Sequence, residues 1–249
     1  MLKFDLGQHL PVLLLIDDDM ISREVTATVL TIKGYQIFTA ESGLDALHQL
    51  AKEACMPDVI LMDVQMPGLS GVSLIEALRQ RAKAKIVTVS ACPPPAEVVA
   101  AADGFLLKPF DAAALVELLR RGKQGEGQVS ASAQVDASVP VVNQTTLKQL
   151  RSMMSSGAVN EIYTAVVADL NQRAEALELA IGGSNLAEVR RIGHAIKGGC
   201  GMAGAAEAAH IGALLENSDQ LDNSASLLRE LRAATTRLER ILKEEFQRS

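Results

Sequence analysis

Short apolar segments alternate with helix-like segments between residues 12 and 121. One of them, Val59–Met62, is apolar throughout, as expected of a strand that is covered on both faces of a parallel sheet. The five predicted strands are Val12–Ile16, Gln36–Thr39, Val59–Met62, Ile86–Val89 and Phe105–Leu107, and the helical segments lie near 21–32, 42–53, 71–82, 95–102 and 111–121, the last with Asp111 as its cap. This alternation predicts an α/β, doubly wound, five-stranded parallel sheet.

The pattern changes in the second half of the chain. Residues 122–142 are rich in Gly, Ser and Ala and have no periodicity, which is typical of a flexible linker. From Asn143 onward the sequence predicts helices alone, near 143–156, 159–182, 185–199, 204–221 and 224–246. We therefore expect three parts: a first domain at 1–121, a linker at 122–142 and an all-α four-helix bundle at 143–249, whose first helix caps or extends the bundle.

Composition excludes several functions. The net charge is −6 and no basic stretch stands out, which argues against nucleic-acid binding. No run approaches 18 apolar residues, so we expect no membrane insertion. The three cysteines (Cys55, Cys92 and Cys200) are far apart and indicate small buried side chains in a reducing compartment, so we expect a cytoplasmic protein.

Carboxylates follow two of the predicted strands. Asp17, Asp18 and Asp19 come directly after the first strand, and Asp63 follows the third. Because the carboxyl ends of parallel strands share one edge of the sheet, these groups should lie close together and repel one another unless a cation lies among them. Hard oxygen ligands suit Mg²⁺. Taken separately, Asp63 could be a helix cap and the Asp17–Asp19 run a solvated turn.

Two further polar residues follow later strands. Ser90 comes after Ile86–Val89, and Lys108 comes after Phe105–Leu107. A metal, an ammonium and a hydroxyl that face a carboxylate form a cage for a transferring phosphoryl group, with the carboxylate as nucleophile. Ser90 could instead be a helix cap and Lys108 a surface residue, but four such features at successive strand ends favour the cage.

Residues 10–121 resemble a response-regulator receiver domain, which has a flavodoxin-like fold. The matching motifs are Leu14-Leu15-Ile16-Asp17-Asp18-Asp19, Leu61-Met62-Asp63-Val64-Gln65-Met66-Pro67-Gly68, Val89-Ser90-Ala91 and Gly104-Phe105-Leu106-Leu107-Lys108-Pro109-Phe110. The resemblance implies that Asp63 accepts a phosphoryl group and that Asp18, Asp63 and the backbone carbonyl of Gln65 bind Mg²⁺, with Asp17 acting mainly through water. It also implies that Ser90 and Lys108 contact the phosphoryl oxygens and that Phe105 is the aromatic switch residue, whereas Asp19 matches no family ligand.

One departure from the receiver pattern concerns the fourth helix. Residues Cys92-Pro93-Pro94-Pro95 precede a short alanine-rich segment, and three prolines cannot lie inside a helix. We therefore expect this helix to be shortened or displaced, and we do not carry over the dimer contacts that receivers commonly make there.

His194 is the histidine with the most informative neighbours. Arg190, Arg191, Lys197 and Gly198 lie three or four residues from it and share its helical face, while an apolar stripe occupies the other side. His194 should therefore be exposed and flanked by cations, which favour its neutral nucleophilic form, with a glycine leaving space for a partner. The alternative is an ordinary surface histidine, the interpretation we adopt for the chain's other three.

The segment His194-Ala195-Ile196-Lys197-Gly198-Gly199-Cys200-Gly201-Met202-Ala203-Gly204, with Leu215-Glu216 on the next helix, resembles a histidine-containing phosphotransfer domain. The resemblance covers roughly residues 145–246. It implies that His194 is the phosphoacceptor, that Lys197 supports the phosphoryl group and that Gly198 allows a receiver to dock. We expect Arg190 and Arg191, which share this helical face, to belong to the docking surface as well.

Together these features predict a phosphorelay protein of bacterial two-component signalling. Asp63 would take phosphate from a sensor histidine kinase, and His194 would exchange it with Asp63 or with another receiver domain. Nothing resembles an ATP-binding kinase module, so we expect a phosphotransfer intermediate rather than an enzyme. The alternative is a phosphorylation-gated regulator whose bundle sequesters a partner without transferring phosphate. A DNA-binding output domain is disfavoured because no basic recognition helix stands out.

Overall fold

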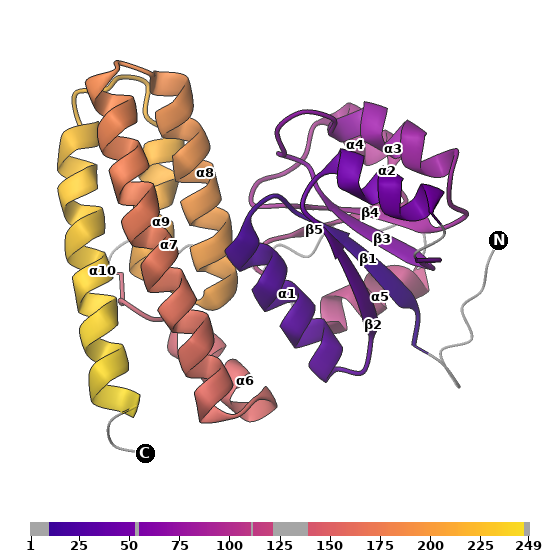
Figure 1. Ribbon diagram of the computed structural model, residues 1–249, viewed down its shortest axis with the longest axis horizontal. Coiled ribbons are helices and arrows are strands. Elements are labelled where there is room, and N and C mark those ends of the chain that lie inside the picture. The colour runs from indigo at the N-terminus through magenta and orange to yellow at the C-terminus, as the bar shows by residue number, and fades with distance from the viewer. Residues whose placement is uncertain (1–9, 53–54, 111, 122–138, 247–249) are drawn as a thin grey trace. The chain divides into compact units, whose positions relative to one another are not determined.

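The computed structural model describes residues 10–52, 55–110, 112–121 and 139–246 (Figure 1). The chain divides into two compact units, Met1–Ala133 and Gln134–Ser249. The predicted linker at 122–142 and the predicted cap Asp111 lie largely outside the described residues. The domain boundaries therefore stay a prediction, and each unit is described by itself.

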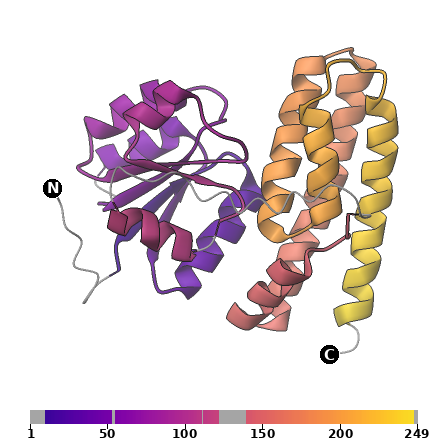
Figure 2. The same ribbon diagram turned by 180° about the vertical axis from the view of Figure 1, so that it is seen from behind.

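The first unit is a five-stranded parallel sheet with helices on both faces. Its strands are β1 (Val12–Ile16), β2 (Gln36–Ala40), β3 (Val59–Asp63), β4 (Lys85–Ser90) and β5 (Gly104–Leu107), in the order β2-β1-β3-β4-β5. Its helices are α1 (Met20–Ile32), α2 (Gly43–Ala51), α3 (Gly71–Arg79), α4 (Ala96–Ala101) and α5 (Ala112–Arg121). Helices α1 and α5 cover one face of the sheet and α2, α3 and α4 the other (Figures 1 and 2). The predicted fold class of this unit is confirmed.

Each face of the sheet buries its own core because successive side chains of a strand point to opposite faces. Ile60 and Met62 pack with residues of α2 and α3 on one face. Val59 and Leu61 pack with residues of α5 on the other. This explains why β3 contains no polar residue before its last position.

The sheet differs from the prediction mainly at the strand ends. Asp63 and Ser90 are the last residues of β3 and β4 rather than the first residues after them. A prediction from polarity ends each strand at its last apolar residue, whereas the pairing of the strand with its neighbours in the sheet continues for one more residue. Helix α4 has only 6 residues and begins after Pro95, so it is short, as the prolines predicted.

The second unit is helical. Helices α7 (Ser156–Gly182), α8 (Leu186–Ala203), α9 (Ala206–Glu216) and α10 (Ser224–Phe246) form the bundle, and α6 (Gln144–Met153) precedes them (Figure 1). The amide of Asn143, the N-cap of α6, donates to the carbonyl of Gly204 in the turn between α8 and α9 (2.8 Å). The start of α6 is thereby tied to the bundle. None of the described helices is long and apolar enough to cross a membrane.

Two helix ends were predicted wrongly. Helix α8 continues through its glycines to Ala203 rather than ending near residue 199, and it stops where Gly204 adopts a left-handed conformation (φ 76°). Helix α9 ends at Glu216 rather than near residue 221. The second difference matters for the site, because it puts Glu216 in the last turn of α9.

Candidate functional site

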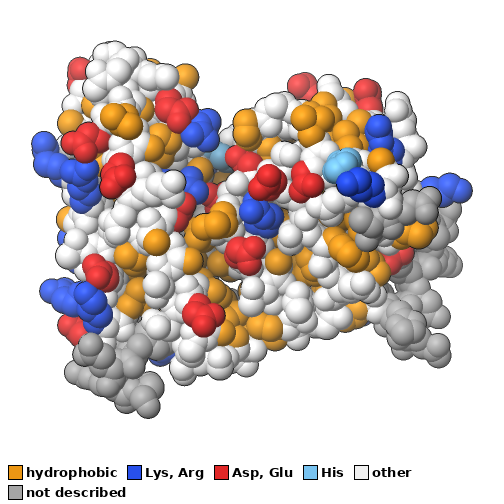
Figure 3. All heavy atoms as spheres, viewed as in Figure 1, with side chains coloured by type: hydrophobic (Ala, Val, Ile, Leu, Met, Phe, Trp, Pro, Cys, Tyr) orange, Lys and Arg blue, Asp and Glu red, His pale blue; other side chains and the backbone are white. Residues whose placement is uncertain are grey.

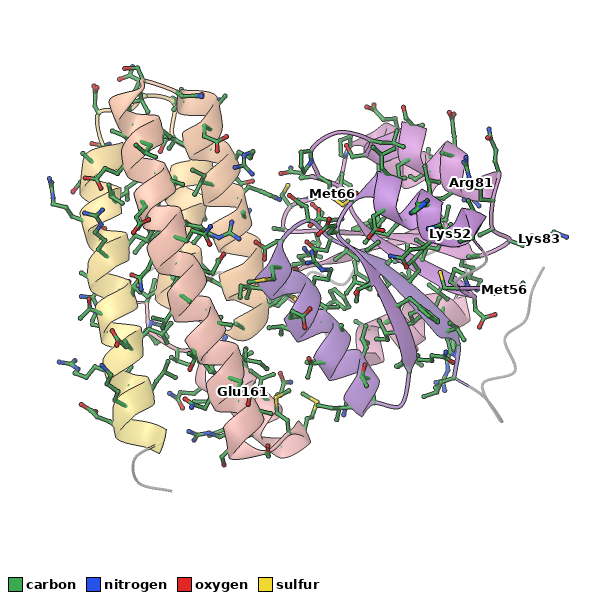
Figure 4. All side chains as sticks on the ribbon, in the orientation of Figure 1. Lys52, Met56, Met66, Arg81, Lys83 and Glu161 are labelled. Carbon is green, nitrogen blue, oxygen red and sulfur yellow. The ribbon has the colours of Figure 1, made fainter. Side chains whose placement is uncertain are left out.

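The carboxyl ends of the strands meet at one edge of the sheet. Backbone hydrogen bonds hold them together, namely Asp17 N to Ala40 O (3.1 Å), Val64 N to Val89 O (3.1 Å) and Lys108 N to Ser90 O (2.8 Å). In Figure 4, Met66 marks this edge, just after β3, and Met56 marks the opposite edge, just before β3. The four strand-end features identified in the sequence are thus brought to the same edge.

Lys108 connects two of the predicted carboxylates directly. Its Nζ lies 2.7 Å from Asp17 Oδ2 and 2.6 Å from Asp63 Oδ2. All three side chains are almost fully buried, with exposed fractions of 4% for Lys108, 2% for Asp17 and 6% for Asp63. Burial alone would lower the pKa of Lys108, but the two carboxylates raise it above its ordinary value, so this ammonium stays charged.

Negative charge is nevertheless in excess at this edge. Burial raises the pKa of Asp17 to about 6; the charge of Lys108 opposes this rise and that of Asp63 adds to it. Burial, and then the charge of Asp63, also raise the pKa of the half-buried Asp18. One ammonium thus leaves an excess of negative charge on Asp17, Asp18 and Asp63, which a divalent cation such as Mg²⁺ would neutralise.

The described residues contain no group of three His, Cys, Asp or Glu side chains arranged to hold a metal ion together. The predicted direct ligands are two carboxylates, Asp18 and Asp63, and a backbone carbonyl, that of Gln65. That ligand set stays a prediction.

Helix α1 holds the acidic segment in place. Asp19, which matched no family ligand, is the N-cap of this helix and accepts a hydrogen bond from the Ser22 amide (2.7 Å). The Ser22 hydroxyl donates to Asp17 Oδ2 (2.7 Å), and the Arg23 guanidinium donates to the Asp17 carbonyl. Sequence reasoning missed Ser22 and Arg23. The position of Ser22 was recognisable, because an Asp that caps a helix commonly accepts a hydrogen bond from the amide three residues later.

The loops after β3 and β4 also meet near Asp63. The Gln65 amide donates to Asp63 Oδ1 (2.8 Å), and the Gln65 side-chain amide donates to the Cys92 sulfur (3.5 Å). Ser90 is buried at the end of β4, where its hydroxyl accepts from the Cys92 amide (3.3 Å). Cys92 itself is half-buried rather than buried as predicted, whereas Cys55 and Cys200 are buried. Phe105 is half-buried on β5, and its predicted switch role stays a prediction.

His194 lies on α8 in a different environment from the one predicted. Its side chain is only 14% exposed, so the expectation of an exposed imidazole was wrong. Its Nδ1 lies 2.8 Å from Glu216 Oε1 on α9, and Lys197 Nζ lies 2.9 Å from the other oxygen of the same carboxylate. The nearest charged partner of the imidazole is thus an anion that belongs to the next helix.

Glu216 determines which nitrogen carries the proton in the trio formed by His194, Lys197 and Glu216. Burial opposes ionisation of Glu216, but hydrogen bonds from Lys197 and His194 outweigh burial and lower its pKa. An ionised carboxylate only accepts hydrogen bonds, so Nδ1 of His194 must carry the proton. In the neutral imidazole the lone pair is then on Nε2.

The predicted docking cations are engaged elsewhere on the bundle surface. Arg190 donates to the Ser218 carbonyl (2.8 Å) and to Asp219 (3.1 Å), and Arg191 forms a two-pronged pair with Glu188 (2.8 and 2.7 Å). A Cβ added to Gly198 would meet no heavy atom within 4 Å, so space is open there. On the face seen in Figure 3, Lys and Arg side chains are interspersed with Asp and Glu side chains.

Comparison with known proteins identifies both units. The family model of the response regulator receiver domain matches residues 13–120, and that of the Hpt domain matches residues 161–241. The transcriptional regulatory protein CseB of Streptomyces avermitilis is 36% identical over 135 residues, which cover 51% of this chain and 56% of CseB. KdpE of Mycobacterium tuberculosis is 31% identical over 130 residues, 51% of this chain and 55% of KdpE. The chain therefore spans about half the length of these curated relatives.

Among solved structures, the chemotaxis protein CheY4 of Vibrio cholerae is 30% identical, covering 45% of this chain and 98% of that protein, with a TM-score of 0.41. The two family matches, by themselves, show which kinds of domain the chain contains. The chain joins a response regulator receiver domain to an Hpt domain, and this pair of domains supports a phosphorelay role in two-component signalling. Both domains are phosphotransfer modules rather than kinase modules.

Proposed function

We propose that Asp63 accepts a phosphoryl group from a phosphohistidine of a sensor histidine kinase, and that His194 exchanges this group with a receiver aspartate. The observation that carries the proposal is the contact between Lys108 and Asp63 (2.6 Å) at the carboxyl edge of the sheet. An ammonium fixed beside a carboxylate, where a phosphoryl group would develop charge, is the arrangement that a carboxylate phosphoacceptor requires.

In the first step an Asp63 oxygen attacks phosphorus, the P–N bond of the donor phosphohistidine breaks, and the released imidazole takes up a proton from solvent. The product is an acyl phosphate on Asp63. Lys108, and Ser90 on the neighbouring strand, are the proposed donors to the phosphoryl oxygens. Asp18, Asp63 and the Gln65 carbonyl would hold Mg²⁺, which neutralises charge on the phosphoryl oxygens when it is bound.

In the second step Nε2 of His194 attacks the phosphorus of an aspartyl phosphate. A P–N bond forms, the P–O bond breaks, and the aspartate leaves as a carboxylate. Glu216 favours this step because it holds the proton on Nδ1 (2.8 Å) and stabilises the positive charge that develops on the ring. Lys197, adjacent on the same helix, is the proposed partner of the phosphoryl oxygens.

The test is labelling of the full chain with radioactive acetyl phosphate and Mg²⁺. We expect the wild type to carry two kinds of label: alkali-labile acyl phosphate on Asp63, and acid-labile, alkali-stable phosphate on His194. His194→Gln should keep only the acyl phosphate, Asp63→Asn should lose both, and the exposed His210→Gln should behave as wild type. Undiminished acyl label in Asp63→Asn would refute the proposal.

A second assay separates transfer from sequestration. A purified receiver domain is added to the labelled chain, and its label is followed over time. Transfer through His194 requires that His194→Gln abolish labelling of the added receiver. An unchanged signal to downstream receivers in that variant would instead favour a bundle that acts by binding alone. With ATP and Mg²⁺ but no kinase, we expect no label on any variant.

A further inference from the structure

Two glycines bring α8 and α9 into direct backbone contact. A Cβ added to Gly193 would lie 2.5 Å from the Glu216 amide nitrogen, 2.7 Å from Leu215 Cβ and 2.8 Å from the Gly212 carbonyl oxygen. A Cβ added to Gly212 would lie 2.6 Å from the Lys197 amide nitrogen and 2.8 Å from the Gly193 carbonyl oxygen. Such distances are too short for real Cβ contacts, and the obstructing atoms are mainly backbone, so a side chain at either position must move one helix away from the other.

The contact lies within the trio described above. Gly193 precedes His194 in the chain, and its missing side chain makes room for the backbone of Glu216. Gly212 lies one turn before Glu216, and its missing side chain makes room for the backbone of Lys197. The hydrogen bonds that Glu216 accepts from His194 (2.8 Å) and Lys197 (2.9 Å) therefore lie where the backbones of the two helices are in contact.

We propose that Gly193 and Gly212 are positioning residues for phosphoryl transfer at His194. By letting α9 contact α8, they set the distance at which Glu216 holds the Nδ1 proton and thereby leave the Nε2 lone pair for phosphorus. This inference rests on the proposed function for its catalytic consequence. Its structural part, the control of the imidazole tautomer, is independent of any phosphate.

The test uses the full chain as Gly193→Ala and Gly212→Ala, with Gly201→Ala as the matched control. Gly201 is on α8 seven residues after His194, and a Cβ there would meet no heavy atom within 4 Å. The first readout is the ¹⁵N NMR spectrum of the labelled imidazole, which separates the Nδ1-protonated from the Nε2-protonated form. The second is the rate of acid-labile labelling of His194 from a phosphorylated receiver.

We expect the wild type and Gly201→Ala to be Nδ1-protonated and to accept phosphate at equal rates. Each of the other two variants, if folded by circular dichroism, should gain the Nε2-protonated form and lose roughly tenfold or more in rate, since small misplacements of reacting groups have effects of this order. The inference would be overturned if the wild type were mainly Nε2-protonated, if the spectra of Gly193→Ala and Gly212→Ala were unchanged, or if both of these variants unfolded. A wild type with the expected spectrum but no label on His194 would refute the proposed function alone.

Discussion

Replacing Lys108 with methionine tests the charge balance of the receiver site. The two contacts of Nζ, 2.7 Å to Asp17 and 2.6 Å to Asp63, limit the separation of the two carboxylate oxygens to about 5.3 Å. Without the ammonium, two charges at that separation repel by about 3 kcal/mol at an effective dielectric constant of about 20. This agrees with the loss of roughly 3–5 kcal/mol expected when one partner of a buried ion pair is removed. We therefore expect Lys108→Met to destabilise the receiver unit by about 3 kcal/mol.

Amide hydrogen exchange followed by mass spectrometry measures this loss, because it reports on each unit of the chain separately. Strands β1 and β3 should exchange roughly a hundredfold faster in Lys108→Met. The exposed Lys83→Met is the control and should match the wild type. Added Mg²⁺ should restore part of the protection, since a bound cation replaces the missing charge and stabilises the folded state by mass action. Equal exchange in Lys108→Met and wild type, or no protection from Mg²⁺, would refute the reasoning.

Three other perturbations are expected to act through stability. The pKa of Glu216 is lowered in the folded protein, so its ionised form stabilises the fold at pH values above its ordinary pKa of 4.5, and this stability is lost as the pH falls through the folded pKa. Glu216→Gln should remove this acid-dependent loss in thermal melts between pH 3 and 6. An unchanged pH profile in the variant would contradict the argument. Gly43→Ala should cost about 1–3 kcal/mol in denaturant titrations, since its Cβ would press on the Leu69 carbonyl; no shift of the midpoint would show that this loop yields freely. Arg237→Ala removes a part-exposed ion pair with Glu207 and should cost at most about 1 kcal/mol in the same titration, because solvent screens the attraction between exposed charges. A larger loss of stability would contradict this reasoning.

The receiver site could be predicted from the sequence because the topology of the sheet determines where the strand-end residues lie. Once the strands are parallel, residues at their carboxyl ends must share an edge, and Asp17, Asp63 and Lys108 do meet there. Which carboxylates the lysine touches could not be predicted, because that depends on side-chain conformations. Nor could the support from Ser22, whose hydroxyl completes the set of partners of Asp17.

The environment of His194 could not be predicted from its own helix. Spacing shows which residues share a face with the imidazole, but it does not show which helix packs against that face. Glu216, 22 residues away on α9, contacts Nδ1 of the ring, and Arg190 and Arg191 pair with other acidic residues. The available signal was a glycine inside each of two successive helices, which is costly for helix stability and indicates close approach of backbones.

The two sites differ in the charge that remains for an incoming phosphoryl group. In the receiver, Lys108 is shared by Asp17 and Asp63, and Asp18 adds a third carboxylate, so a further anion requires a further cation. In the bundle, the single carboxylate of Glu216 is already matched by Lys197 (2.9 Å), and in the proposed reaction the imidazole itself would become cationic on phosphorylation. The proposed need for Mg²⁺ is therefore a property of the receiver alone. In the proposed transfer the bundle would rely instead on the geometry of one ammonium and one carboxylate, and we infer that this geometry depends on how closely α8 and α9 approach.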